Sequence, residues 1–195
     1  LQPVKIHASK VVAPQRGKRS VLAFYSGGVD STFHLMASPK EDLPSRALTI
    51  HGMDYKPDND RNFLALVKKT EPLLKHFGIE RVTIKSDVAQ YGKATILHGF
   101  TLAGCASLLS DVFGTAQIAA DYTWEQDMMS WPWGTNHVTN RYFAGSDWSL
   151  KTVTSDFSRT EKIEAIAANK MACDSISFCT DSKSRPVNCG RCQKC

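Results

Sequence analysis

The stretch "SGGVDS" (residues 26–31) combines residue types whose spacing could do chemistry. A serine and two glycines are followed by an Asp–Ser pair. Glycines let the backbone approach a ligand closely, and the N–H groups at the start of a helix attract an anion. A bare phosphate would repel Asp30, so a metal ion such as Mg²⁺ would have to bridge the two. The stretch therefore predicts a phosphate seat with magnesium.

This stretch differs from two common nucleotide-binding loops. It lacks the terminal Gly-Lys-Ser/Thr of the Walker loop, and it does not follow the G-x-G-x-x-G dinucleotide fingerprint. The alternative interpretation is a plain tight turn with capping serines. The complete hexapeptide after an apolar run and before a helix favours the phosphate seat.

A second stretch could bind a metal. Four of the six cysteines crowd the C-terminal end of the sequence: Cys179, Cys189, Cys192 and Cys195. Two-residue spacings let thiolates converge on one ion, and four thiolates in tetrahedral geometry suit zinc. The alternatives are an iron–sulfur cluster, or Cys173 in place of Cys179 as the fourth ligand. A disulfide framework would need a secreted context, which nothing in the sequence indicates.

Strands and helices that alternate along the chain must position these residues. Apolar runs predict five strands, at 20–26, 47–53, 81–87, 115–123 and 150–156. Helices are predicted between the glycines and Pro39, from the caps at 58–60 to Gly78, at 96–111 and at 159–170. Pro72 should kink or split the second of these helices. The order predicts an α/β fold, a doubly wound five-stranded parallel sheet with helices on both faces.

Polar residues follow the predicted strands, among them Ser26, His51, Asp54 and Asp121. In such sheets ligands bind beyond the carboxyl ends of the strands, near the switch point. The segment 121–143 lies above this edge and is rich in aromatic residues: Tyr122, Trp124, Trp131, Trp133, Tyr142 and Phe143. A long aromatic loop in this place usually shapes a substrate pocket, and a small core beneath the loop is the alternative.

The "SGGVDS" stretch resembles the pyrophosphate loop of the N-type ATP pyrophosphatases, the PP-loop superfamily. The cysteine tail is similar to the end of 7-cyano-7-deazaguanine synthase, in which zinc is structural. An uncharacterised PP-loop group is similar over most of residues 20–195, in a Pro-Trp-Gly segment, an "SRTEKI"-like helix and an "NCGRCQKC" tail. The resemblance implies an adenine nucleotide alpha hydrolase-like fold with a small C-terminal zinc-binding knuckle. It also implies cleavage of ATP between the α and β phosphates.

The resemblance implies roles for individual residues. Those that would hold the β and γ phosphates with Mg²⁺ are Ser26, Gly27, Gly28, Asp30 and Ser31. Lys162 would reach the ATP phosphates, with Arg159 as a neighbouring candidate and an exposed helix lysine as the alternative. Candidates for contacts with the rest of the nucleotide are His51, Asp54, His98 and Gly99. The candidate catalytic residues are Asp30, Ser31 and Lys162.

We therefore expect an AMP-forming, ligase-like enzyme. It would adenylate a carboxylate or carbonyl oxygen and pass it to a nitrogen nucleophile, with ATP and a small carboxylate as partners. One alternative is a tRNA-modifying enzyme that thiolates or amidates a base. Another is a non-catalytic ATP-binding module of a longer chain.

The composition agrees with one globular domain, since 42% of the 195 residues are hydrophobic and 22% are charged. A net charge of +5 is compatible with nucleotides or RNA, although many domains with this charge bind neither. No apolar run approaches the roughly 20 residues of a membrane span, so we expect a cytoplasmic protein with no membrane partner. We expect a basic arm at 1–19, an ATP pyrophosphatase domain at 20–178 and a zinc knuckle at 179–195. Because the sequence begins with Leu1, part of a longer chain is expected, and a homodimer is also open.

Overall fold

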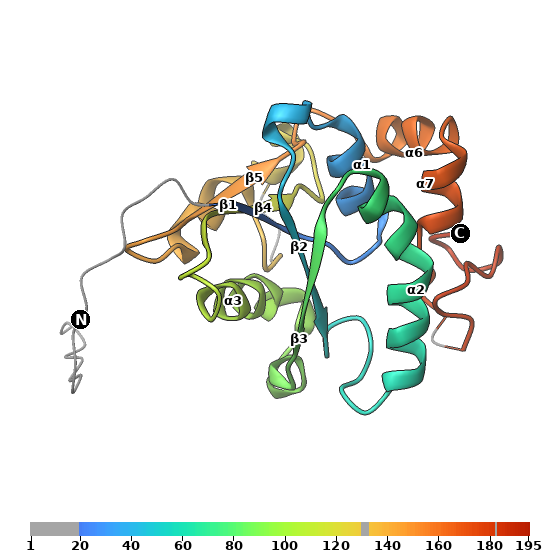
Figure 1. Cartoon of the computed structure of the whole chain (residues 1–195), viewed down its shortest axis with the longest axis horizontal. Helices are drawn as coiled ribbons and strands as arrows, with labels where there is room; N and C mark the ends of the chain where they lie inside the picture. The colour runs from blue at the N-terminus through green and yellow to red at the C-terminus, as the bar shows by residue number, and fades with distance from the viewer. Residues whose placement is uncertain (1–19, 130–132, 182) are drawn as a thin grey trace.

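The computed structural model describes residues 20–129, 133–181 and 183–195 (Figure 1). The predicted basic arm at 1–19 and Trp131 of the aromatic segment lie outside the described residues.

Five parallel strands form one sheet in the order β3-β2-β1-β4-β5. They are β1 (Ser20–Phe24), β2 (Arg46–His51), β3 (Glu80–Lys85), β4 (Phe113–Ala119) and β5 (Ser149–Val153). The predicted five-stranded parallel sheet is thus confirmed. Each strand ends before its predicted end, and after β1, β2 and β4 the polar residues that follow belong to the site rather than to the ladder. The strand order reverses between β1 and β4, so the switch point lies there.

The main helices are α1 (Val29–Ala37), α2 (Asp60–His76), α3 (Ala94–Ser107), α6 (Arg159–Ala167) and α7 (Lys170–Ser175). Asn59 caps α2 as predicted, since its side chain accepts from the Asn62 N–H. Pro72 does not split α2, because the helix is held by buried apolar residues on both sides of it, Phe63 and Leu66 before it and Leu73 and Leu74 after it. The predicted helix 159–170 ends at Ala167, and Asn169 caps the separate helix α7.

Several short helical turns fill the connections. They are η1 (Lys40–Asp42), η2 (Val88–Tyr91), α4 (Trp124–Asp127), α5 (His137–Asn140) and η3 (Arg141–Phe143). Three of them lie in the aromatic segment, for which the sequence shows few helix signals. None of the helices within the described ranges is long and apolar enough to cross a bilayer.

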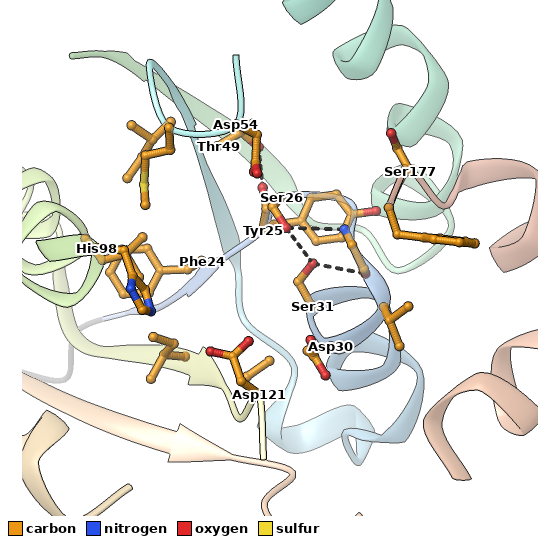
Figure 2. A pocket seen from close by; sticks show the side chains of 18 of the residues that line it. Phe24, Tyr25, Ser26, Asp30, Ser31, Thr49, Asp54, His98, Asp121 and Ser177 are labelled. Atoms are coloured by element: carbon orange, nitrogen blue, oxygen red, sulfur yellow. Dashed lines mark hydrogen bonds between the residues drawn. The ribbon is translucent and has the colours of Figure 1, made fainter. Parts of the chain in front are cut away.

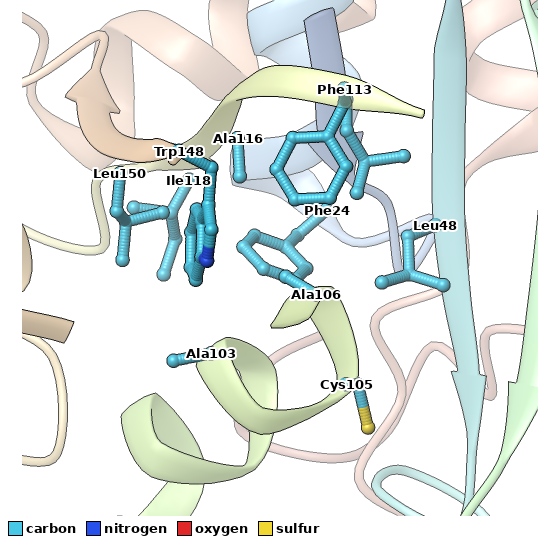
Figure 3. Packing of buried hydrophobic residues seen from close by; sticks show 11 residues of the cluster. Phe24, Leu48, Ala103, Cys105, Ala106, Phe113, Ala116, Ile118, Trp148 and Leu150 are labelled. Carbon is cyan, nitrogen blue, oxygen red and sulfur yellow. The ribbon is translucent and has the colours of Figure 1, made fainter. Parts of the chain in front are cut away.

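Helices cover both faces of the sheet, as predicted (Figure 1). On one face the small residues Ala103 and Ala106 of α3 let this helix pack closely against Phe24, Phe113 and Trp148 (Figure 3). The Phe113 and Trp148 rings meet edge to face, with 5.5 Å between their centroids. On the other face α1, α2, α6 and α7 share a second core. The two cores fix the sheet between them and leave its carboxyl edge free for a site.

Helix α1 contains a buried titratable group, His34, which is 1% exposed. Its ring nitrogens have no hydrogen-bond partner among the described residues. Desolvation lowers the pKa of His34 to about 4, and Gln117 opposes this shift without reaching hydrogen-bond geometry.

We predict that acid weakens the fold through His34. The unfolded chain binds a proton at this residue below about pH 6.5 and the folded chain only below about 4, so the unfolding free energy should fall as pH drops through this window. The loss should be of the order of 3 kcal/mol. Urea denaturation at several pH values should show a flatter acid dependence for His34→Gln than for the parent. The exposed His76→Gln is the matched control, and identical acid slopes in parent and His34→Gln would contradict the prediction.

Candidate functional site

The predicted phosphate loop lies at the switch point of the sheet, between β1 and α1. Gly27 has a φ of +75°, a conformation that favours glycine. Helix α1 begins without a capping side chain from any described residue, so the N–H groups of its first turn lack this kind of partner. The hydroxyls of Ser26 and Ser31 lie 3.5 Å apart beside them (Figure 2). These donors and the helix dipole make the loop suitable for an anion.

Polar side chains of β2, β3 and α2 support this loop. Thr49 donates to the Tyr25 carbonyl at 2.9 Å. Arg81 donates to the Thr49 hydroxyl at 2.6 Å and to the Thr70 hydroxyl at 2.8 Å. It also pairs with Glu71 at 3.0 Å, and its guanidinium lies 5.5 Å from the centroid of the Tyr25 ring. The start of the phosphate loop is thereby tied to β2 and, through Arg81, to β3 and α2, by contacts that the sequence did not reveal.

Two cations of α6 hold Asp30 in the first turn of α1. The Lys162 Nζ lies 3.2 Å from Oδ1, and the Arg159 Nη2 lies 3.1 Å from Oδ2. Lys162 is fully buried and also donates to the Ala120 carbonyl at 2.6 Å. Burial raises the pKa of Asp30, while Arg159 and Lys162 oppose this shift. The two charge pairs therefore offset part of the cost of burying this carboxylate.

A cavity of about 500 Å³ opens beyond the carboxyl ends of β1, β2 and β4 (Figure 2). The predicted site residues that line it are Ser26, Gly28, Asp30, Ser31, Asp54, His98 and Arg159. Its apolar lining includes Phe24, Leu48, Ile50, Leu97, Leu102 and Ile118. Figure 2 shows Ser26 and Ser31 on one side of the cavity, with Phe24 and His98 on the other. An anion seat beside an apolar wall suits a ligand that has both a charged group and a flat ring.

Four other predicted site residues do not line the cavity: Gly27, His51, Gly99 and Lys162. His51 is buried and stacks on Phe63 with 4.2 Å between ring centroids, and its Nε2 lies 2.9 Å from the Lys56 carbonyl oxygen. Gly99 instead lets α3 approach the backbone of Gly134, where an added Cβ would collide. Gly27 accepts a close approach of Thr70, and Lys162 reaches the cavity only through Asp30.

Asp121 follows β4 and also lines the cavity. Its Oδ2 accepts from the Trp133 Nε1 at 2.9 Å and from the Thr135 hydroxyl at 3.1 Å. Because the single proton of this hydroxyl goes to Asp121, the Thr135 oxygen accepts from the His98 Nε2, 2.9 Å away. This series of hydrogen bonds fixes the tautomer of His98, with the proton on Nε2. The sequence signal that could have added Asp121 to the predicted site was the position of Asp121 directly after a strand.

The aromatic segment lines the cavity in part, through Tyr122 and Trp133. Its other described aromatic residues contact other partners. Trp124 packs on His137, and Phe143 meets Phe100 edge to face with 4.7 Å between ring centroids. The segment therefore forms one wall of the cavity and also packs in part against α3.

The C-terminal tail lies beside the cavity. The Ser177 N–H donates to the Gly27 carbonyl at 2.7 Å, and Arg185 donates to the Asp54 carbonyl at 2.6 Å. Residues of this part of the chain that line the cavity are Ser177, Phe178, Arg185 and Lys194. The tail thus contacts segments that follow β1 and β2. No pattern in the sequence indicated this path.

The four tail cysteines, Cys179, Cys189, Cys192 and Cys195, converge. Their sulfur atoms all lie within 4.8 Å of one another, so they could hold a metal ion. The backbone N–H groups of Arg191 and Cys192 donate to the Cys189 sulfur and lower the pKa of this thiol. Cys173 lies apart and donates to the Ile166 carbonyl at 3.2 Å. The structure thus selects Cys179 rather than Cys173 as the fourth member.

Comparison with known proteins supports the fold. Neither a family model nor a curated protein matches the sequence. Among solved structures, the chain is similar to the U34-tRNA thiolase NcsA from Methanococcus maripaludis, solved with its 4Fe–4S cluster, with a TM-score of 0.50 and 14% sequence identity. The similarity covers 83% of this chain and 59% of that chain, so this chain spans less than two thirds of the thiolase. The similarity shows that this chain shares its five-stranded α/β fold with that thiolase.

Proposed function

We propose that the chain binds ATP with its β and γ phosphates in the loop at 26–31 and cleaves it to AMP and pyrophosphate. The observation that supports this most directly is the place of the loop. It lies at the start of α1 and at the switch point of the sheet, and it opens into a cavity with an apolar wall. The fold shared with a tRNA thiolase is in keeping with this chemistry.

The loop would bind the pyrophosphate that leaves. The N–H groups of the first turn of α1 and the hydroxyls of Ser26 and Ser31 would donate hydrogen bonds to the charge that develops on it. Arg159 is 45% exposed and lines the cavity, so it can contact the phosphates directly. Lys162 is a positioning residue in this scheme, because it acts through Asp30.

Asp30 is the residue we assign to Mg²⁺. Its carboxylate lines the cavity and offers oxygen ligands of the kind that Mg²⁺ prefers. It already pairs with Arg159 and Lys162, so Mg²⁺ would share the carboxylate with these two cations. When bound, the ion neutralises charge on the phosphate oxygens.

The activated group is proposed to be a carboxylate or carbonyl oxygen, and the nucleophile that replaces AMP is proposed to be a nitrogen. An adenylate is a far better leaving group than the oxygen from which it is made. We assign the acceptor to the wall formed by Tyr122 and Trp133, next to the Asp121 carboxylate.

A tRNA-modifying activity is the second candidate. It is favoured by the position of the cysteines, which lie in a tail that lines the same cavity as the phosphate loop. The structurally similar protein is a tRNA thiolase with a 4Fe–4S cluster. Binding of tRNA that weakens steeply with salt would favour this candidate over a small carboxylate acceptor.

We predict AMP and pyrophosphate as the products of ATP, because the loop seats a leaving pyrophosphate and a Walker lysine is absent. Incubation with ATP, Mg²⁺ and either a panel of carboxylates or tRNA, followed by chromatography of the nucleotides, measures this. ADP as the sole product would contradict the proposed chemistry. ATP binding without turnover under every condition would indicate a non-catalytic module.

Arg159→Gln should slow AMP formation by about 10²-fold, a loss like that caused by removing one donor that stabilises developing negative charge. The fold should persist, because Asp30 keeps its bond to Lys162. The matched control is Arg141→Gln, since Arg141 is exposed and contacts the adjacent Tyr142 instead of the cavity. Equal rates in Arg159→Gln and the parent would remove Arg159 from the site.

We predict one zinc ion per chain at the cysteine cluster. A tetrahedron with Zn–S bonds of about 2.3 Å has S–S edges of about 3.8 Å. The Cys179–Cys192 and Cys189–Cys195 pairs are each separated by 3.8 Å. An iron–sulfur cube would hold its thiolates farther apart, because the cube lies between them.

Elemental analysis of protein purified without oxygen tests this prediction. Cys192→Ser should lose the zinc and lower the melting temperature, because metal affinity contributes to folding stability. Cys173→Ser is the matched control and should retain the metal. Iron with acid-labile sulfide would contradict zinc and favour the thiolase alternative, and free thiols without metal would refute both.

A further inference from the structure

Two cations of the tail line the cavity, Arg185 and Lys194. Both lie in the segment 179–195, which begins and ends at a residue of the cysteine cluster. Arg185 lies between Cys179 and Cys189, and Lys194 lies between Cys192 and Cys195. The cysteine cluster and the cavity therefore share one stretch of chain.

Arg185 is held firmly. Its guanidinium donates to the carbonyls of Cys179 and Asp54, and it lies over the Tyr55 ring at 5.7 Å from the centroid. The side chain is only 20% exposed. These contacts orient one cation of the tail at the rim of the cavity without help from a ligand.

Lys194 depends on the cysteines for its position. Within the described chain, the hydrogen bonds of residues 189–195 join them only to other residues of the tail, such as the Cys195 N–H to the Cys192 carbonyl at 2.9 Å. They are anchored to the buried start of the tail through Cys192, whose sulfur lies 3.8 Å from that of the fully buried Cys179 and which also interacts with Thr180. A metal bound by the four sulfurs would convert this approach into covalent ties.

The buried end of the tail is in turn fixed to the phosphate loop. Asn188 accepts from the Phe178 N–H at 3.0 Å and donates to the Ile176 carbonyl at 3.1 Å. Ser177, between these two residues, donates to the Gly27 carbonyl. Residues 176–178, which lead into Cys179, thus bond to the phosphate loop through Ser177 and to Asn188, next to Cys189, through Ile176 and Phe178.

We propose that Arg185 and Lys194 bind the anionic group of the ligand that fills the cavity, and that the metal held by the cysteines fixes Lys194 for this task. Metal and anion then raise each other's affinity, by the same factor in both directions. The inference rests on the proposed function in one respect, because the anion expected in this cavity is a pyrophosphate group.

Calorimetry with inorganic pyrophosphate tests the coupling. The chain loaded with one equivalent of Zn²⁺, with free metal removed, should bind pyrophosphate at least about tenfold more tightly than the reduced, metal-free chain. In the loaded state Lys194→Gln should weaken binding by about tenfold and keep its zinc, since one charge-assisted contact is lost. Arg191→Gln is the matched control, because Arg191 lies in the same knuckle but does not line the cavity.

Equal pyrophosphate affinity with and without zinc would overturn the inference, and so would an unchanged affinity in zinc-loaded Lys194→Gln. The second result does not require the metal-free chain to remain folded. Zinc-dependent pyrophosphate binding in a chain that makes no AMP would support the inference while the proposed function fails. AMP formation with parent-like binding in Lys194→Gln would overturn the inference alone.

Discussion

The buried ammonium of Lys162 is the group on which the arrangement of the site depends. It joins α6 to Asp30, 132 positions away along the chain, and to the Ala120 carbonyl after β4. A buried charge that loses its partner destabilises a protein by about 3–5 kcal/mol. The chain can bury this ammonium only by bringing α6, the first turn of α1 and the end of β4 together. The same requirement fixes the acidic residue of the phosphate loop in a single place, without any ligand.

The two sides of the cavity are held in different ways. On the sheet side, Arg81 connects β3, β2 and α2 beneath the loop, and the two cores lock the strands. Regular elements of this kind can hold a binding geometry precisely. On the tail side, short turns and a few long-range hydrogen bonds take that role. The sheet side therefore provides a rigid phosphate site, whereas the order of the tail side depends on what the cysteines bind.

Local patterns predicted the elements well, because the central strand β1 is largely apolar and "SGGVDS" has a distinct composition. They also indicated which residues end the strands, and seven of the proposed site residues do line the cavity. Lys162, His51 and Gly99 were placed differently by the fold. Nothing in a sequence reveals that His51 stacks on Phe63, or that Gly99 meets Gly134 from another segment. The path of the tail was also hidden, since it depends on contacts between Ser177 and Gly27 rather than on periodicity.

The bond between Ser177 and Gly27 has a consequence for biosynthesis. A ribosome delivers the chain from its N-terminus, so the phosphate loop emerges early and the residue that closes over it emerges late. The central strand β1 must likewise wait for β4 before both of its edges are paired. A nascent chain therefore displays an unfinished sheet with exposed strand edges, and during this interval it is open to aggregation, chaperones and proteases. Competence for phosphate binding should appear abruptly, when the tail segment leaves the exit tunnel.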